Sequence, residues 1–341
     1  MRILFLTISG RKGASSRYRV YQYIPFFEEA GHKVVVMPPA DGKGRGLGRL
    51  FRGITEERSF IDAVRGADVV FIQKRLFRRG FIDKLRRLGK KMVFDFDDSV
   101  FTSPKGDWSA GTRRRVLGRL KAVLEASDLV VAGNAFLGTY AAKAGASRLE
   151  VLPTAVETEK YMPKEHRGGT VVLGWIGSSV NHSYLDTLSG VLPAIAKEFP
   201  GLKLLVVSDK DYAMEGVTVE NRRWSEGTEA ADLLGMDIGL MPLADNDWTR
   251  GKCALKALQY MACGIPAVCS PVGANNEVVE DGVDGCLPVD EGGWVTAIRS
   301  LVSSPELRDS MGQAGRKKVI EQYSVAVLAP RYVRLVESLW A

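Results

Sequence analysis

Ten short apolar runs, each about the length of a buried strand, recur along this chain of 341 residues and alternate with longer amphipathic stretches. Continuous apolar strands separated by helices are typical of a parallel sheet that is covered by helices on both faces. The pattern restarts near Thr170, after a segment in which prolines, glycines and charges interrupt it. The sequence therefore predicts two doubly wound α/β domains. The runs are RILFLTI, HKVVVMP, ADVVFIQ, KMVFDFD, DLVVAGN, TVVLGWIG, KLLVVSD, DIGLMPL, IPAVCSP and GCLPV.

The length supports this division, because 341 residues exceed what one hydrophobic core usually organises. We expect a first domain over residues 1–155, a linker over 156–169, a second domain over 170–324 and a closing helix over 325–341. Ligands of open α/β sheets bind beyond the carboxyl ends of the strands. Two such Rossmann-like domains that face each other across a cleft would hold a substrate between them.

The composition excludes several other classes of protein. A hydrophobic content of 45% with 26% charged residues describes an ordinary globular chain, and no run approaches the length of a membrane span. The apolar start is too brief for a signal peptide, so we expect a cytoplasmic protein. The four cysteines lack zinc-site spacing and are expected to be buried thiols.

Charge is unevenly distributed between the two halves. Residues 1–165 hold 31 Lys and Arg against 18 Asp and Glu, whereas residues 166–341 hold 16 against 22. The first half is therefore at +13 and the second at −6. This asymmetry indicates an anionic partner for the first half, either a membrane surface or a phosphate-bearing substrate, with nucleic acid the weaker candidate. The alternative is a solvated surface, since clusters such as 113–115 lie in helical surroundings.

One expected helix, within GKCALKALQYMACGIP, carries an unusual set of polar residues. At about 100° per residue, Lys252, Lys256 and Gln259 form a stripe opposite an apolar face. Two ammonium groups near a helix N-terminus oppose the macrodipole, and a bound anion such as a diphosphate would satisfy them. Gln259 could bind the hydroxyls of a ribose. The alternative is an ordinary amphipathic helix with solvated lysines.

The same stretch, LKALQYMACGIPAVCSPVG, followed by NNEVVEDGVDGCLPV, resembles the donor-binding region of family-4 retaining glycosyltransferases, which have the GT-B fold. The resemblance extends through GHKVVV, LPTAVE, GWIGS, DIGLMPL and MGQAGRKKVIEQYS. It implies a final helix that crosses back to the first domain. Family members usually carry two glutamates separated by seven residues, and these positions are Gly251 and Gln259 here. Asp245 and Asp247 are candidates to replace the missing first carboxylate.

The resemblance also implies how a diphosphate is held. A glycine turn after the first strand matches SGRKGASSRYR, which includes Gly13, Arg11, Lys12, Arg17 and Arg19. In the second domain the usual arginine after GWIGS is missing, so hydroxyls and amides of that turn would share the work with basic side chains. Trp224 is a candidate contact for the base, with a core or surface tryptophan as an equal alternative. The predicted donor-binding residues are Gly177, Ser178, Ser179, Trp224, Arg250, Lys252, Lys256, Gln259, Gly273, Ala274 and Asn275.

The segment DFDDS contains Asp95 and Asp97, which imitate an Asp-x-Asp metal site. Alternation places both on one face of a strand. By position, Asp97 matches the active-site histidine of the resembled family, so we expect it to orient the sugar or the acceptor hydroxyl. We assign catalytic roles to Asp97, Lys252 and Gly13, and we expect no metal and no cofactor.

The resemblance implies a nucleotide-sugar-dependent hexosyltransferase. It would move a hexose from a nucleotide diphosphate sugar to a hydroxyl of a glycan or lipid-linked saccharide, with retention. The charge of the first half indicates that the protein could also associate peripherally with an anionic membrane. A nucleotide-sugar epimerase of the same fold and a non-catalytic nucleotide-sugar-binding relative are the alternatives.

Overall fold

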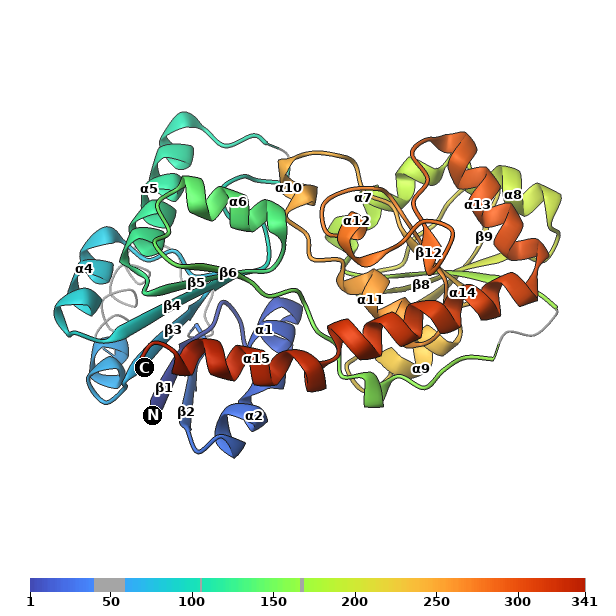
Figure 1. Cartoon of the computed structure of the whole chain (residues 1–341). Helices are drawn as coiled ribbons and strands as arrows, with labels where there is room; N and C mark the ends of the chain where they lie inside the picture. Colours follow the sequence, from blue (N-terminus) through green and yellow to red (C-terminus); the bar gives the residue numbers. More distant parts are fainter. Residues whose placement is uncertain (40–58, 105, 166–168, 341) are drawn as a thin grey trace. The chain divides into compact units, whose positions relative to one another are not determined.

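The computed structural model describes residues 1–39, 59–104, 106–165 and 169–340 (Figure 1). Residues 166–168 of the expected linker and residues 40–58 of the expected first domain lie outside these ranges. Contacts divide the chain into two compact units. Unit 1 comprises residues 1–154 and 328–341, and unit 2 comprises residues 155–327.

Unit 1 contains a parallel sheet of six strands in the order β2-β1-β3-β4-β5-β6. Because β1 lies between β2 and β3, the chain leaves the sheet after β2 and returns on the other side of β1, as in doubly wound folds. The strands are β1 (Arg2–Leu6), β2 (Lys33–Met37), β3 (Val69–Gln73), β4 (Lys91–Phe96), β5 (Leu129–Ala132) and β6 (Leu149–Val151). The described helices include α1 (Ala14–Arg19), α2 (Ile24–Glu29), α4 (Arg79–Arg87), α5 (Ala110–Ala126) and α6 (Ala135–Lys143).

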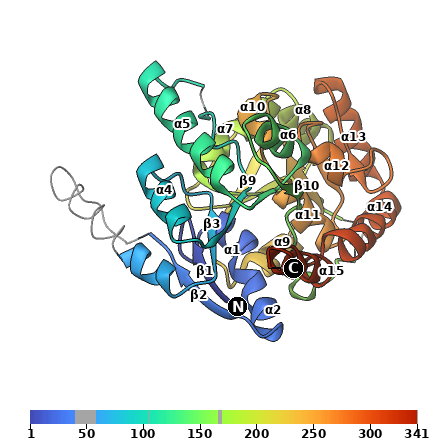
Figure 2. The ribbon, with the colours of Figure 1, turned by 60° about the vertical axis from the view of Figure 1, so that its left-hand side comes forward.

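Helix α15 (Val325–Glu337) begins in unit 2 and continues, from Leu328, in unit 1. Figure 2 shows its course from a second side. Within unit 1, Tyr332 of this helix packs edge-on against Tyr23, with ring centroids 4.9 Å apart, and against Phe71 of β3 at 5.8 Å. The last segment of the chain therefore completes the core of the first unit.

Unit 2 contains a second parallel sheet of six strands, in the order β12-β11-β10-β7-β8-β9. The strands are β7 (Val172–Ile176), β8 (Lys203–Ser208), β9 (Thr218–Arg223), β10 (Ile238–Met241), β11 (Ala267–Cys269) and β12 (Gly285–Cys286). The helices include α7 (His182–Leu185), α8 (Leu192–Glu198), α9 (Glu229–Leu234), α10 (Asp247–Arg250), α11 (Leu255–Ala262), α12 (Asn275–Val278), α13 (Glu291–Ser303) and α14 (Pro305–Lys318).

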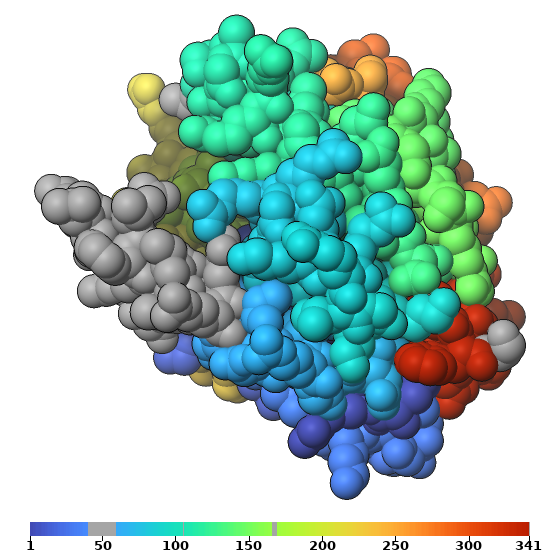
Figure 3. All heavy atoms as spheres, turned by 90° about the vertical axis from the view of Figure 1, so that its left-hand side faces the viewer, coloured from blue at the N-terminus to red at the C-terminus, as the bar shows by residue number. Residues whose placement is uncertain are grey.

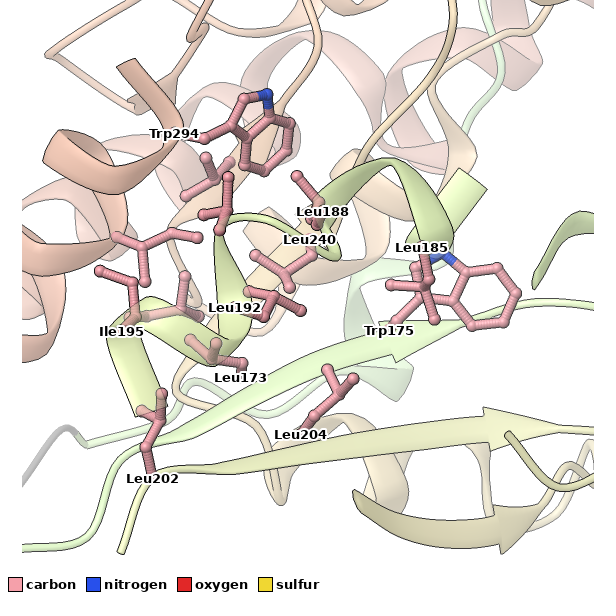
Figure 4. Packing of buried hydrophobic residues seen from close by; sticks show 14 of the residues in the cluster. Leu173, Trp175, Leu185, Leu188, Leu192, Ile195, Leu202, Leu204, Leu240 and Trp294 are labelled. Carbon is pink, nitrogen blue, oxygen red and sulfur yellow. The ribbon is translucent and has the colours of Figure 1, made fainter. Parts of the chain in front are cut away.

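The core of unit 2 joins its sheet to α8 and α13. Leu173 of β7, Leu204 of β8 and Ile195 of α8 are fully buried in one cluster, to which Trp294 of α13 also belongs (Figure 4). Every strand here is followed by a helix or a turn at its carboxyl end. The predicted α/β fold with two Rossmann-like sheets is confirmed. The side chains of the candidate site come together at the ends of the strands.

Candidate functional site

In unit 1 the glycine turn after β1 is closed by a contact that excludes a side chain at Gly13. A Cβ atom at this position would lie 2.0 Å from Oγ of Ser9, and the Gly13 amide donates to the carbonyl of Gly10 over 3.0 Å. Gly13 directly precedes α1, so this close contact lies at the point where the turn meets the helix. Arg11 and Lys12 of the same turn are exposed.

Asp97 lies beside this turn, at the end of β4. One carboxylate oxygen, Oδ1, accepts a hydrogen bond of 2.6 Å from Ser15 of α1 and lies 3.4 Å from the ammonium of Lys74. Burial alone would raise the pKa of Asp97, but Lys74 and the hydrogen bond from Ser15 outweigh it and lower the pKa below its usual range. Asp97 is therefore held as a carboxylate that is 14% exposed and can accept a proton or a hydroxyl hydrogen bond.

Asp95, two residues earlier, has a different role. Its carboxylate is fully buried, receives hydrogen bonds of 3.0 and 2.5 Å from Arg19, and receives a third of 2.7 Å from the hydroxyl of Tyr332. Both Asp95 and Asp97 bind side chains of α1, although β4 ends at Phe96 and Asp97 follows the strand. The expectation that Arg19 could pair with a phosphate is wrong, because this guanidinium is buried and bound to Asp95.

Arg19 and Tyr332 together direct three donor groups at the carboxylate of Asp95. Within residues 1–39, 59–104, 106–165 and 169–340, no group of three His, Cys, Asp or Glu is arranged to hold a metal ion. The arrangement in unit 1 is therefore a buried structural carboxylate next to a partly exposed one.

In unit 2 the predicted donor residues follow the carboxyl ends of neighbouring strands. Gly177 comes after β7, Arg250 belongs to the segment after β10, and Gly273 lies in the loop after β11. A Cβ atom at Gly177 would lie 2.9 Å from Cε of Lys256, and one at Gly273 would lie 2.4 Å from the carbonyl oxygen of Arg250. The structure thus brings Lys256 to the turn after β7, and Arg250 to the loop after β11.

The polar stripe on one helix does not form. Helix α10 ends at Arg250, the Lys252 amide bonds to the carbonyl of Thr249 over 3.0 Å, and α11 begins only at Leu255. The break occurs at Ala254, whose φ of 53° is left-handed. The prediction that Lys252, Lys256 and Gln259 share one helix is therefore wrong for Lys252, which lies in the connecting turn. Its ammonium is 5.3 Å from the ring centroid of Trp248.

Lys256 and Gln259 do lie on α11, but in different environments. Lys256 is half-buried, with its ammonium 5.1 Å from the ring centroid of Trp175. Gln259 is 3% exposed and donates from Nε2 to the hydroxyl of Tyr161 over 3.3 Å. The predicted arrangement of a polar stripe opposite an apolar face does not describe α11, because residues 257–262 are all buried.

The hydroxyl of Tyr161 links Gln259 to the predicted base contact. It donates to Oε1 of Glu229 over 3.1 Å, and Oε2 of Glu229 accepts from Nε1 of Trp224 over 2.8 Å. Gln259 and Trp224 are therefore parts of one hydrogen-bonded chain. Nothing in the sequence pattern singled out Tyr161 or Glu229.

The turn after β7 is already bonded within the protein. The Ser179 amide and hydroxyl both donate to the carboxylate of Asp209, at 2.6 and 2.9 Å, and the Gly177 amide donates to Val207. These hydrogen bonds, chiefly the one from the Ser179 amide, lower the pKa of Asp209 to about 2. A phosphate would have to displace Asp209 to reach the donors of Ser179. Ser178, the residue before Ser179, is the N-terminal cap of a short 3-10 helix.

The loop after β11 is different. Within the described part of the chain, the amides of Gly273 and Ala274 have no acceptor. Asn275 is buried, and its side-chain amide donates to the carbonyl of Ser270 over 2.9 Å. Asp245, proposed above as a replacement carboxylate, forms a bidentate pair with Arg250 at 2.7 and 3.0 Å.

These features define a class of protein before any relative is considered: two Rossmann-like sheets of which the second gathers basic side chains and amides at its strand ends. Solved structures with this architecture cover nearly the whole chain. Sucrose-phosphate synthase from Thermosynechococcus elongatus aligns over 100% of this chain and 99% of its own, with 16% identity and a TM-score of 0.76. HepE from Anabaena in complex with UDP-glucose aligns over 99% and 100%, with 15% identity and a TM-score of 0.68. The fold is GT-B.

Part of the sequence of unit 2 matches a known family. Residues 170–304 match the family model described as glycosyl transferases group 1, and this segment belongs to that family. A GDP-mannose-dependent alpha-(1-6)-phosphatidylinositol monomannoside mannosyltransferase of Mycolicibacterium smegmatis is 25% identical over 217 residues, which cover 55% of this chain and 56% of the relative. An N-acetyl-alpha-D-glucosaminyl L-malate synthase of Bacillus anthracis is 28% identical over 140 residues, covering 38% and 36%. The chain thus spans about a third to a half of the length of these curated relatives.

Proposed function

We propose that this protein transfers a hexose from a nucleotide diphosphate sugar to a hydroxyl of a glycan or lipid-linked saccharide, with retention at the anomeric carbon. The observation that carries the proposal is the placement of Lys256 against Gly177, in a segment that belongs to the glycosyl transferases group 1 family. A departing diphosphate needs fixed positive charge and oriented N–H groups. Lys256, Lys252 and the amides of Gly273 and Ala274 can supply both.

In this proposal unit 2 binds the donor and unit 1 binds the acceptor. UDP-glucose is the ligand of one solved structure with the same fold, and GDP-mannose is the donor named for one relative, so a nucleoside diphosphate is the common chemistry. Asp97 and the turn at Gly13 would orient the sugar or the acceptor hydroxyl. We propose that the clamp of lysines and amides works without a divalent metal.

The donor site is tested by calorimetric titration of UDP and GDP into the parent and three variants. Lys252→Ala and Lys256→Ala are each expected to weaken the binding of a nucleoside diphosphate by about 1.5–3 kcal/mol, as is typical of hydrogen bonds to charged groups. Gln259→Ala is expected to weaken the binding of a nucleoside diphosphate by about 1 kcal/mol. Because Gln259 is buried and bonded to Tyr161, this change should also lower the melting temperature. Excess chelator is expected to leave the parent's affinity unchanged.

Lys317→Ala is the matched control, since this lysine of α14 is 74% exposed. Unchanged affinity in all three site variants would contradict the donor site. Binding that disappears with chelator would contradict the metal-free clamp.

We further propose that unit 1 associates with an anionic membrane surface through α4 and α5, the face turned toward the viewer in Figure 3. The two helices contact each other and carry two acidic residues, Asp83 and Glu125, against many cations. No helix among the described residues is long and apolar enough to cross a bilayer, so such binding would be peripheral. The exposed cations are Arg79, Lys84, Arg86, Arg87, Arg113, Arg114, Arg115 and Lys121.

Vesicle co-sedimentation tests this surface. The parent is expected to bind anionic vesicles, to bind neutral ones weakly, and to dissociate as salt rises, because each basic residue near the surface contributes about 1 kcal/mol. The triple change Arg113→Glu, Arg114→Glu and Arg115→Glu should abolish the difference between the two lipids. Equal and negligible binding of the parent to both vesicles would reject the membrane role and leave an anionic acceptor as the partner.

A further inference from the structure

Lys74 has a backbone conformation that side chains rarely adopt. It directly follows β3, and its φ of 60° is left-handed; Ala254 is the other described non-glycine residue with a positive φ. The amide of Lys74 donates to the carbonyl of Asp95 over 2.8 Å. A lysine held in this conformation between two neighbouring strands points to a local role, because glycine would adopt it without strain.

The side chain of Lys74 lies between two carboxylates. Its ammonium is 3.4 Å from Oδ1 of Asp97 and forms a short ion pair with Oδ2 of Asp98. The Lys74 side chain is 16% exposed, against 14% for Asp97 and 23% for Asp98. The ammonium therefore bridges the two successive residues that follow β4, and it fixes the direction of both carboxylates.

A second group of side chains holds Asp97 from the other side. Gln73, fully buried, accepts from the Ile8 amide over 3.0 Å and from the Ser16 hydroxyl over 2.9 Å through Oε1, while its Nε2 donates to Ser15 over 2.8 Å. Ser15 in turn donates to Asp97. Two consecutive residues, Gln73 and Lys74, thus connect the glycine turn after β1 to the carboxylate after β4.

We propose that Lys74 is a positioning residue, whose ammonium clamps the carboxylates of Asp97 and Asp98 so that Asp97 stays aimed beside the glycine turn as a hydroxyl acceptor. The inference rests on the proposed function for the identity of the reaction, but the clamp itself is a property of unit 1. Lys74 has no separate role in binding an anion, because the two aspartates already neutralise it.

The electrostatic consequence has a definite sign. The charged groups described near Asp97 include Lys74, Arg19 and Asp95, and Asp98 is bound to the same Lys74 ammonium; burial opposes ionisation of Asp97, and Lys74 is the largest favourable influence. Without the ammonium of Lys74, burial and the neighbouring carboxylates raise the pKa of Asp97 against less opposing positive charge. The pKa of Asp97 should therefore rise. As the pH is lowered, any activity that needs the Asp97 carboxylate should be lost at a higher pH in the variant than in the parent.

The experiment compares Lys74→Met, Lys74→Arg and Lys91→Met. Lys91→Met is the matched control, because it removes an ammonium from the opposite, amino end of β4, where Lys91 pairs with Asp128 at 3.4 Å. The pKa of Asp97 is followed by carboxyl-carbon NMR titration and assigned with Asp97→Asn. Release of UDP from UDP-glucose is measured across pH, and melting temperature reports folding.

Lys74→Met is expected to raise the pKa of Asp97, to lower kcat by about 10- to 100-fold with KM for the donor unchanged, and to move the acid limb of the kcat profile to higher pH. Lys74→Arg should restore most of these properties, and Lys91→Met should leave all of them unchanged. An unchanged Asp97 pKa in folded Lys74→Met would overturn the clamp, whatever the reaction is. A raised pKa with full turnover in Asp97→Asn would instead overturn the proposed role of Asp97.

Discussion

Replacing Asp97 with asparagine is expected to lower kcat by about 10²–10⁴-fold, the usual contribution of a positioned group that accepts a proton or a hydroxyl hydrogen bond. Asparagine keeps the size of the side chain and can still accept from Ser15, but it loses the negative charge that faces Lys74. The residues proposed to bind nucleotide all belong to unit 2, so the affinity for UDP should stay the same. Steady-state kinetics and calorimetry measure the two quantities.

Asp62→Asn is the control for this change, because Asp62 is a 71% exposed carboxylate of the same unit and pairs with Arg65. Its kcat should equal that of the parent. A kcat within about threefold of the parent in Asp97→Asn would show that Asp97 does not take part in the reaction.

The second large effect concerns stability. Asp95→Leu is expected to destabilise unit 1 by about 3–5 kcal/mol, because it leaves the fully buried guanidinium of Arg19 without its carboxylate partner. The double variant Arg19→Met with Asp95→Leu removes both charges and should recover much of the loss. Native-state hydrogen exchange of amides in β1, β3 and β4 measures the free energy of opening of this unit separately from unit 2.

Asp128→Asn provides the comparison, since the pair of Lys91 and Asp128 is more than a third exposed on both sides and should contribute about 0–1 kcal/mol. Equal losses in Asp95→Leu and Asp128→Asn, or a double variant that is no better than Asp95→Leu, would contradict the account of a buried pair that anchors α1 and α15 to β4.

Most of the fold could be predicted from the sequence because central strands of a parallel sheet are apolar on both faces. All ten predicted runs contain strands of the two sheets. The strands β6 and β9 were missed, and both are at sheet edges: β6 is three half-buried residues, and β9, TVENRR, is mostly exposed and polar. An edge strand needs little hydrophobic surface, so it leaves little pattern to detect.

The candidate site was less predictable than the fold. The expected helix through Lys252 failed because helical spacing cannot reveal the left-handed Ala254, which interrupts the helix. Lys74, Tyr161 and Asp209 were not identified, because each acts through a partner that is distant in sequence, such as Asp97 for Lys74. Asp97 and Gly13 were identified from a resemblance, and the structure adds the hydrogen bonds and the close contact that hold them.

The central claim is that unit 2 binds a nucleotide diphosphate sugar, and thermal stabilisation by a panel of UDP-, GDP- and ADP-sugars tests it most directly. A ligand that binds the folded state raises the melting temperature by mass action, by an amount that grows with its concentration over Kd. The account predicts that one nucleotide series stabilises the parent and that Lys256→Ala loses most of this stabilisation. No stabilisation by any member of the panel at millimolar concentration, or equal stabilisation of the parent and Lys256→Ala, would contradict it.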